Sequence, residues 1–223
     1  MTKRNAIIVA GGSGSRMDTS VPKQFLLLKG FPLIYWSLHK FQQSNCALVL
    51  VIPSDFLDYY DHLVKKYHIH FPVQLCTGGD SRFESVQNGM KMIDNASTLT
   101  AIHDAARPFI KPSLIEQLFQ VAEKKGNCIP LIDLKDSIRK VDGQQSSIAI
   151  REEFKMVQTP QVFRTEDLKR IYTNPILGTF SDDASLMERN GHCINFIEGD
   201  YTNIKITTPE DLVIAEKLAE TLL

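Results

Sequence analysis

The amino-acid sequence predicts an α/β fold: a doubly wound, mostly parallel sheet with a protruding β-hairpin arm. Three observations predict it. Apolar runs of strand length alternate along the chain with stretches of helical periodicity. The strongest runs are continuously apolar, which is typical of parallel strands covered on both faces. A single segment, near residues 137–150, has instead the pattern of a hairpin.

Four strands are expected in the first half of the chain, and each ends at glycine, proline or a polar residue: Ala6–Val9, Cys46–Ile52, Val73–Cys76 and Leu99–Ile102. The run Cys46–Ile52 is apolar throughout and is stopped by Pro53. Such runs fit central strands of a sheet that is buried on both faces.

Helical patterns lie between and after these strands. Pro32 opens the first, in which Ile34, Leu38 and Phe41 share one face, and Phe83, Val86, Met90 and Ile93 define the second. The segment Ser113–Glu116 matches a capping box, and its helix is expected to stop at Gly126. The segment Thr208–Asp211 predicts the start of a last helix, with a capping hydroxyl, proline in the first turn and acids at the positive end of the dipole.

The hairpin is predicted from two β-rich runs, Ser137–Val141 and Ser147–Ile150, joined through Asp142-Gly143. It is too small to be a domain, and its apolar side chains have nothing local to pack against. We therefore expect one domain over residues 1–223, with an arm at about 134–156 that a second subunit covers. This predicts a homodimer.

Composition excludes several classes of protein. The chain has 223 residues, 43% apolar, with 25 Lys+Arg against 26 Asp+Glu. That near-zero net charge disfavours a nucleic-acid partner, and no apolar run approaches the ~20 residues of a membrane span. No signal peptide is expected either. Four scattered cysteines (Cys46, Cys76, Cys128, Cys193) fit neither a zinc site nor a disulfide scaffold, so a cytoplasmic protein is expected.

Polar and glycine-rich clusters follow three of the expected strands: Gly11–Arg16, Gly78–Arg82 and His103–Arg107. In open α/β sheets, ligands bind beyond the carboxyl ends of the strands, so these clusters place the site. The first loop fails as a Walker A motif, because no Gly-Lys-Ser/Thr is present. It also fails as a dinucleotide fingerprint, because Met17 stands where the third glycine is needed.

The stretch from Ala10-Gly11-Gly12 through Gly14, Arg16-Met17 and Pro22-Lys23-Gln24 resembles the signature of sugar-nucleotide pyrophosphorylases and related nucleotidyltransferases. Glycines let a backbone approach phosphate closely, and arginine and lysine match its charge in different geometries. Further motifs follow in order: Gly78-Gly79-Asp80-Ser81-Arg82, Ser85-Val86, His103 to Pro108, Thr159-Pro160-Gln161, Asp182 to Ser185 and Asn203 to Thr207.

Together these motifs, from Ile7 to Leu212, resemble the 2-C-methyl-D-erythritol 4-phosphate cytidylyltransferase family, with the ribitol-5-phosphate cytidylyltransferases as close relatives. The resemblance implies a Rossmann-like fold of the nucleotide-diphospho-sugar transferase type. It implies attack of an acceptor phosphate oxygen on the α-phosphorus of CTP, with pyrophosphate leaving. The partners would be CTP and a sugar-alcohol phosphate, with Mg²⁺ as cofactor.

The resemblance also assigns catalytic roles. Arg16 and Lys23 would stabilise charge on the α-phosphate and the leaving group, or form a solvated pair. Arg151 and Lys205 would hold and orient the acceptor, Arg151 from a segment that reaches a neighbouring subunit. Asp104 would ligate Mg²⁺, or else pair with Arg107. We expect the neighbouring His103 to be a structural support.

Substrate binding is assigned in the same way. Base recognition falls at Gly79, Asp80 and Ser85, with backbone groups of Ala10 and Gly11 nearby, although Asp80 could instead cap the following helix. The remaining binding residues are Gly12, Gly14, Ala105, Arg107, Thr159 and Ser181. Ser181 stands where the family often has threonine. Asp182 and Asp183 are better explained by a helix start than by paired acid–base catalysis.

Three other functions were weighed. The ribitol-5-phosphate enzyme shares much of the pattern and differs in its acceptor. A non-catalytic nucleotide-binding module would be expected to lose Lys23, Asp104 or Lys205, and all three are present. A nicotinamide dehydrogenase is disfavoured because the dinucleotide fingerprint fails.

Overall fold

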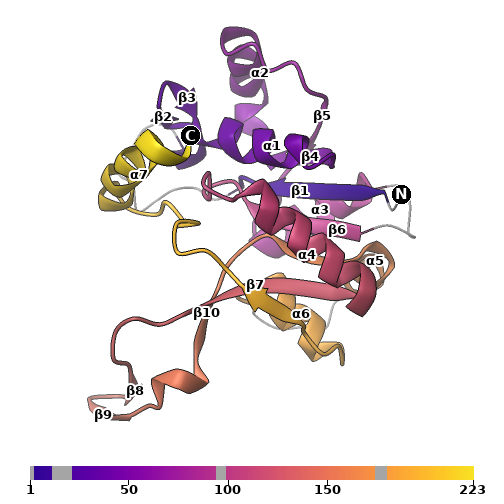
Figure 1. The fold of residues 1–223 in the computed structure, drawn as a ribbon. Helices are drawn as coiled ribbons and strands as arrows, with labels where there is room; N and C mark the ends of the chain where they lie inside the picture. The colour runs from indigo at the N-terminus through magenta and orange to yellow at the C-terminus, as the bar shows by residue number, and fades with distance from the viewer. Residues whose placement is uncertain (1–2, 12–21, 94–98, 174–179) are drawn as a thin grey trace.

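The computed structural model describes residues 3–11, 22–93, 99–173 and 180–223. These residues form an eight-stranded sheet with helices on both faces (Figure 1). Its parallel part has the order β6-β1-β4-β5, from β6 (Leu99–Asp104), β1 (Arg4–Val9), β4 (Ala47–Ile52) and β5 (Val73–Thr77). The predicted α/β class and the four predicted strands are confirmed, with β6 two residues longer than expected.

The other part of the sheet is mixed. Strand β11 (Gln161–Arg164) inserts antiparallel between β6 and β7 (Asn127–Asp133). Strand β10 (Lys155–Val157) pairs antiparallel with β7, and β12 (Phe196–Glu198) pairs parallel with it. The insertion of β11 matters for the site, because the residues just before it lie beside the end of β6.

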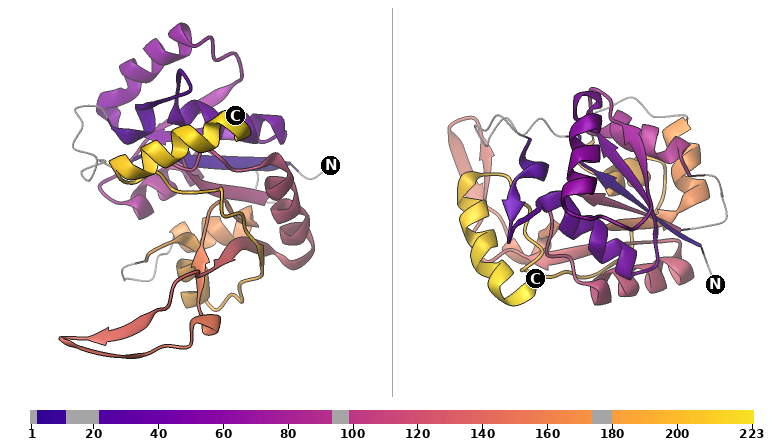
Figure 2. Two further views of the ribbon diagram at one scale, coloured as in Figure 1. Left: turned by 60° about the vertical axis from the view of Figure 1, so that its left-hand side comes forward. Right: turned by 90° about the horizontal axis from the view of Figure 1, so that it is seen from above.

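Helices cover both faces of the sheet (Figure 2). One core cluster joins the sheet to α1 (Leu33–Gln43), α2 (Leu57–Lys66) and α4 (Pro112–Lys125). A second, on the opposite face, joins it to α3 (Arg82–Lys91), α5 (Thr165–Thr173) and α6 (Asp183–Arg189). The apolar positions predicted for the first two helices lie in these cores, because their 3.6-residue spacing places them on one side.

A third, smaller cluster attaches α7 (Pro209–Leu222) to the strand pair β2 (Leu27–Leu28) and β3 (Phe31–Pro32). As predicted, α7 begins with a capping hydroxyl, since that of Thr208 accepts from the Asp211 backbone N–H. The Asp211 carboxylate in turn accepts from the Thr208 N–H at 2.9 Å, which completes a capping box. None of the helices in the described ranges has both the length and the apolar character that a bilayer span requires.

The start of α4 corrects one prediction. The expected capping box Ser113–Glu116 does not form; Lys111 is the N-cap residue and makes no side-chain cap. Glu116 instead pairs with Arg4 of β1, whose Nη2 donates to Oε1 at 2.9 Å. The helix begins at Pro112, so Ser113 lies inside its first turn and not at the capping position. The helix ends, as expected, at Gly126, which has a φ of +93°.

The predicted hairpin is present and projects from the body of the molecule (Figures 1 and 2). Strands β8 (Arg139–Asp142) and β9 (Gln145–Ile148) pair through a two-residue turn, Gly143-Gln144, one position later than expected. We call residues 134–154, between β7 and β10, the arm. Its apolar side chains lie in solvent, with Ile148 85% and Val141 68% exposed.

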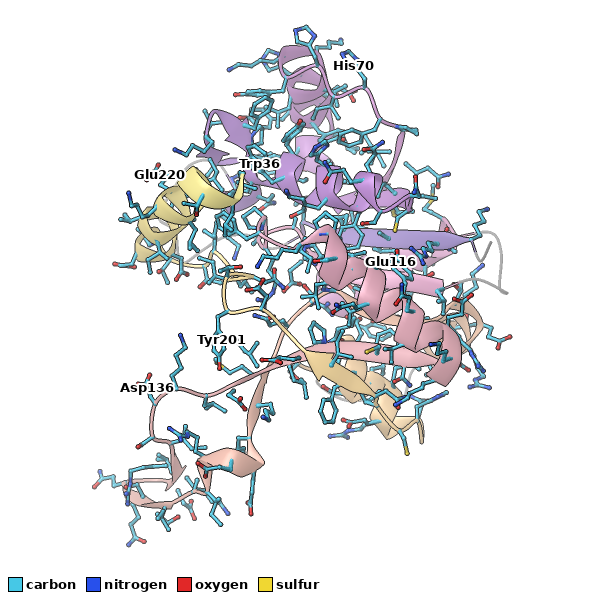
Figure 3. All side chains as sticks on the ribbon, in the orientation of Figure 1. Trp36, His70, Glu116, Asp136, Tyr201 and Glu220 are labelled. Atoms are coloured by element: carbon cyan, nitrogen blue, oxygen red, sulfur yellow. The ribbon has the colours of Figure 1, made fainter. Side chains whose placement is uncertain are left out.

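The root of the arm is fixed by contacts with Tyr201, which follows β12 (Figure 3). The Tyr201 hydroxyl donates to the Asp133 carbonyl at 3.1 Å, and Lys135 Nζ lies 4.3 Å from the centre of the Tyr201 ring. The base of the arm is therefore tied to the sheet, while its tip extends away from it.

Candidate active site

Several of the predicted site residues that the structure describes lie where the parallel strands end. Asp104 is the last residue of β6, Gly11 lies two residues beyond β1, and Gly78 directly follows β5. Register brings these ends together, since Val9 pairs with Asp104, and Val51 beside it pairs with Cys76. Because carboxyl ends of parallel strands share one edge of a sheet, the site lies there.

Asp104 lies at the centre of a cluster of charged side chains. Its Oδ2 lies 2.7 Å from Lys205 Nζ and 3.9 Å from Arg107 Nε, and its Oδ1 lies 3.6 Å from Arg82 Nε. Burial alone would raise the pKa of this carboxyl, but attraction to Lys205, Arg82 and Arg107 holds it well below its usual value. Asp104 is therefore a buried anion matched by cations from three separate segments.

Asp104 is supported by Thr159, which lies just before the neighbouring strand β11, and by His103, which precedes Asp104 in β6. The Thr159 hydroxyl accepts from the Asp104 backbone N–H at 3.1 Å and lies 3.2 Å from His103 Nδ1. The other ring nitrogen of His103 lies 3.2 Å from the Arg107 carbonyl oxygen. Burial lowers the pKa of His103 to about 4, so the ring is neutral at pH 7. These contacts agree with the structural role expected for His103.

The segment that carries Lys205 is held in place by hydrogen bonds to two neighbouring segments. Gln158 Nε2 donates to the Asp200 carbonyl at 2.8 Å, and Asn203 Nδ2 donates to the Thr159 carbonyl at 2.9 Å. Arg107 Nη1 donates to the Asn203 carbonyl at 2.8 Å. The segment carrying Lys205 is thus fixed to the strand end that carries Asp104.

A cavity of about 650 Å³ opens from this cluster. Its lining includes the charged cluster of Asp104, Arg82, Arg107 and Lys205, and also Thr159 and Ser181. Five of these six residues were predicted to belong to the site from the sequence. Arg82 was recognised only as the last residue of a motif, and no role was predicted for it. Because cations converge in the lining of a concave surface, the cavity suits a phosphorylated ligand.

The base-recognition residues form a second group around Ser85. The Ser85 hydroxyl accepts from the Gly79 N–H at 3.2 Å. A Cβ on Gly11 would lie 2.9 Å from this oxygen and one on Gly78 would lie 3.0 Å from it, so both loops need glycine to pass Ser85.

Ser81, and not Asp80, caps α3, because the Ser81 hydroxyl accepts from the Glu84 N–H at 3.1 Å. The alternative of Asp80 as the cap is therefore wrong. The exposed Asp80 instead donates its backbone N–H to Glu84 Oε2 at 2.7 Å.

Lys23 lies in a short 3₁₀ helix, Lys23–Phe25, next to the first loop. Its neighbour Gln24 donates from Nε2 to the Ala10 carbonyl at 2.6 Å, which ties this helix to the end of β1. The Ala105 N–H donates to the Val9 carbonyl at 3.0 Å, at the same strand end. Gly12, Gly14 and Arg16 lie outside the described residues.

Arg151 is not brought to the cavity of its own subunit. It lies on the arm, where Nη1 donates to the Lys135 carbonyl at 3.0 Å and Nη2 pairs with Glu152 at 3.2 Å. It is exposed and is not among the residues that line the cavity.

The described residues contain no group of three or more His, Cys, Asp or Glu side chains arranged to hold a metal ion. Mg²⁺ commonly uses only one or two protein carboxylates and keeps several waters.

Comparison with known proteins identifies the family of this chain. A family model described as 2-C-methyl-D-erythritol 4-phosphate cytidylyltransferase (IspD) matches residues 5–221. The chain belongs to this family. It is 38% identical over 218 residues to the enzyme of that name from Bacteroides thetaiotaomicron, covering 97% of this chain and 99% of the relative. The corresponding identity with the Porphyromonas gingivalis enzyme is 39% over 217 residues, covering 97% of both chains.

Solved structures give the same answer for the fold. The 4-diphosphocytidyl-2C-methyl-D-erythritol synthase of Anaerococcus prevotii superposes with a TM-score of 0.85 at 26% identity, over 98% of this chain and 96% of that one. The cytidylyltransferase of Thermus thermophilus gives 0.76 at 27% identity, over 96% and 98%. As an IspD cytidylyltransferase, the protein is a nucleotidyltransferase that uses CTP in isoprenoid biosynthesis, which confirms the predicted activity.

Proposed function

We propose that the cavity beside Asp104 is where the phosphate of 2-C-methyl-D-erythritol 4-phosphate attacks the α-phosphorus of CTP. The observation that carries this assignment is the convergence of Lys205, Arg82 and Arg107 on one ionised carboxylate in the lining of the cavity. Transfer to phosphorus needs positioning and charge stabilisation more than covalent participation by the protein, and this arrangement supplies both.

The cytosine ring binds between the loops that meet at Ser85. The N–H groups of Gly79 and Asp80 already donate within the protein, so the exocyclic amine of cytosine meets carbonyl acceptors there. The Ser85 hydroxyl accepts from Gly79 and keeps its own hydrogen for an acceptor on the ring. Ala10 and Gly11 form the opposite wall, which the close approach of Gly11 to Ser85 supports.

The triphosphate runs along the first loop toward Asp104. Backbone groups of Gly12, Gly14 and Ala105 hold it, and Arg16 and Lys23 neutralise the charge that grows as pyrophosphate leaves. The hydrogen bond from Gln24 to Ala10, which ties the Lys23 turn to the end of β1, supports the role of Lys23.

The site fits Mg²⁺ through Asp104. Its carboxylate is ionised, and its Oδ1 lies 3.6 Å from Arg82 Nε, beyond hydrogen-bond distance. When bound, Mg²⁺ would neutralise phosphate charge. The protein itself contributes one hard oxygen and a set of cations that orient the reacting phosphates.

The acceptor is oriented by Lys205, Arg107, Thr159 and Ser181 of one subunit and by Arg151 of another. The exposed apolar side chains of the arm, and the absence of Arg151 from the lining of its own cavity, support a homodimer in which arms are exchanged. The four free cysteines support a reducing, cytoplasmic location.

The test of the reaction is pyrophosphate release with CTP and Mg²⁺, with methylerythritol phosphate and ribitol 5-phosphate offered in parallel. We expect turnover with the first acceptor only, and its loss in Asp104→Asn. Turnover with ribitol 5-phosphate alone would contradict the proposed acceptor, and full activity of Asp104→Asn would contradict the proposed site.

A mixing experiment tests the shared site. With the acceptor held well below the raised KM of the Arg151→Ala variant, homodimers of Lys23→Ala and of Arg151→Ala should each have little activity. A heterodimer of the two rebuilds one intact site. Random mixing should therefore restore about a quarter of wild-type activity. Absence of recovery in a mixture proven to contain heterodimers would show that each subunit completes its own site.

A further inference from the structure

Asp183, at the start of α6, is a buried carboxylate that the proposed reaction does not use. Its side chain is fully buried, accepts from the Tyr172 hydroxyl at 2.5 Å and pairs with Arg82 Nη2 at 2.7 Å. It is not needed to cap α6, since Asp182 accepts the Ser185 N–H at 3.1 Å. A buried charge that caps nothing calls for another explanation.

Tyr172 gives Asp183 a fixed anchor. Its ring stacks on Phe83 with centroids 4.8 Å apart, and its carbonyl accepts from Gln87 Nε2 at 2.6 Å, so α3 and α5 hold it together. Burial and the neighbouring Asp183 raise the pKa of Tyr172 far above its usual value. The phenol therefore stays protonated and donates to Asp183.

Arg82 lies between two carboxylates and is within hydrogen-bond distance of only one of them. Its Nη2 is 2.7 Å from Asp183, whereas its Nε is 3.6 Å from Asp104 Oδ1. A guanidinium prefers to grip a carboxylate through two parallel hydrogen bonds. Without the charge of Asp183, Asp104 would be the remaining acidic partner of Arg82 in the structure, and the guanidinium would close on Oδ1.

We propose that Asp183, anchored by Tyr172, is a positioning residue that holds Arg82 back from Asp104 and keeps the Asp104 carboxylate open to the cavity. This inference rests on the proposed role of Asp104. Arg82 and Asp183 also neutralise each other's charge. The guanidinium of Arg82 is therefore not drawn into a tight ion pair with Oδ1 of Asp104.

The test measures cation binding as well as turnover. In Asp183→Asn, the Mg²⁺ concentration for half-maximal turnover should rise about tenfold, as expected when one charge-assisted contact competes at Oδ1. Mn²⁺ binding to the enzyme–CTP complex without acceptor, followed by water-proton relaxation, should weaken by a similar factor. The KM for CTP at saturating Mg²⁺ should change less than twofold.

Two comparisons separate this role from a structural one. Tyr172→Phe keeps the Asp183 charge and should give a smaller shift in the same direction, which tests the inference if Asp183→Asn does not fold. In an Arg82→Ala background, Asp183→Asn should add less than a twofold further change. Asp167→Asn, which removes an Arg–Asp pair of 2.8 Å on α5 outside the cavity lining, is the matched control and should leave the Mg²⁺ requirement unchanged.

The outcomes are distinct. A wild-type Mg²⁺ requirement in folded Asp183→Asn, or an equal effect of that change with and without Arg82, would overturn the inference. If Asp104→Asn itself keeps full activity, the proposed role of Asp104 is wrong and the inference falls with it. Loss of activity in Asp104→Asn with normal Asp183→Asn would remove the positioning role alone.

Discussion

Removing the charge of Lys205 probes the proposed mechanism most directly. Lys205→Met keeps much of the side-chain length but deletes the ammonium that lies 2.7 Å from Asp104 Oδ2. Asp104 would keep Arg107 and Arg82, at 3.9 and 3.6 Å, so it stays ionised while losing its closest cation. The substitution therefore tests the positioning of charge at the cavity and leaves the fold of the strand end in place.

The magnitude follows from the contact and its exposure. A hydrogen bond to a charged group contributes about 1.5–3 kcal/mol, but Lys205 is 41% exposed and solvent screening favours the lower part of that range. About 1.5–2 kcal/mol corresponds to a loss of roughly 10- to 30-fold in kcat/KM for the acceptor.

The assay is steady-state pyrophosphate release with saturating CTP and varied acceptor. Lys111→Met is the matched control, because it removes an ion pair of the same 2.7 Å length from a lysine 49% exposed that does not line the cavity. Its activity should stay within twofold of wild type. Activity of Lys205→Met within twofold of wild type, or an equal loss in Lys111→Met, would refute the reasoning.

Three further predictions follow. Lys23→Ala should lower kcat by roughly 10²–10³, the range for a single preorganised donor, and wild-type turnover would remove Lys23 from the mechanism. Arg151→Ala should raise the KM for the acceptor with little change for CTP; an equal rise for both would count against its assignment. Burial lowers the pKa of His103 to about 4, against about 6.5 in the unfolded chain. Between these two pH values the unfolded chain binds a proton that the folded chain does not, so the free energy of unfolding decreases as the pH falls. Urea unfolding should show a loss of about 3 kcal/mol over that interval that His103→Gln abolishes, and an unchanged slope in the variant would contradict it.

The sheet was predictable because its strands are defined by local pattern. The run Ala47–Ile52 is apolar on both faces, and only a strand covered by two layers of helices satisfies it. The start of α4 was not predictable in the same way. Glu116 has the spacing of a capping residue, and only the folded sheet brings Arg4 within reach to take it. The local signal does not set the start of the helix, which lies at Pro112.

In the candidate site, too, some features could be predicted from sequence motifs and others depend on tertiary packing. The resemblance to the cytidylyltransferase family implied Asp104, Thr159 and Lys205, because each belongs to a motif that can be recognised in the sequence alone. Arg82 and Asp183 were visible as residues, but their pairing across 101 positions depends on how α3 and α6 pack. The one available signal was that both belong to quoted motifs and carry opposite charge.

The arm leaves the sheet at β7 and returns at β10, and these two strands pair with each other. The two ends of the arm are therefore held side by side by this strand pairing. Changes in the length of the arm should not move Thr159 or Asp104. Closing a longer loop costs only about 0.6 kcal/mol for each doubling of its length. The hairpin β8–β9 can accordingly be remodelled to suit the surface it meets, while Thr159 and Asp104 of its own subunit keep their positions.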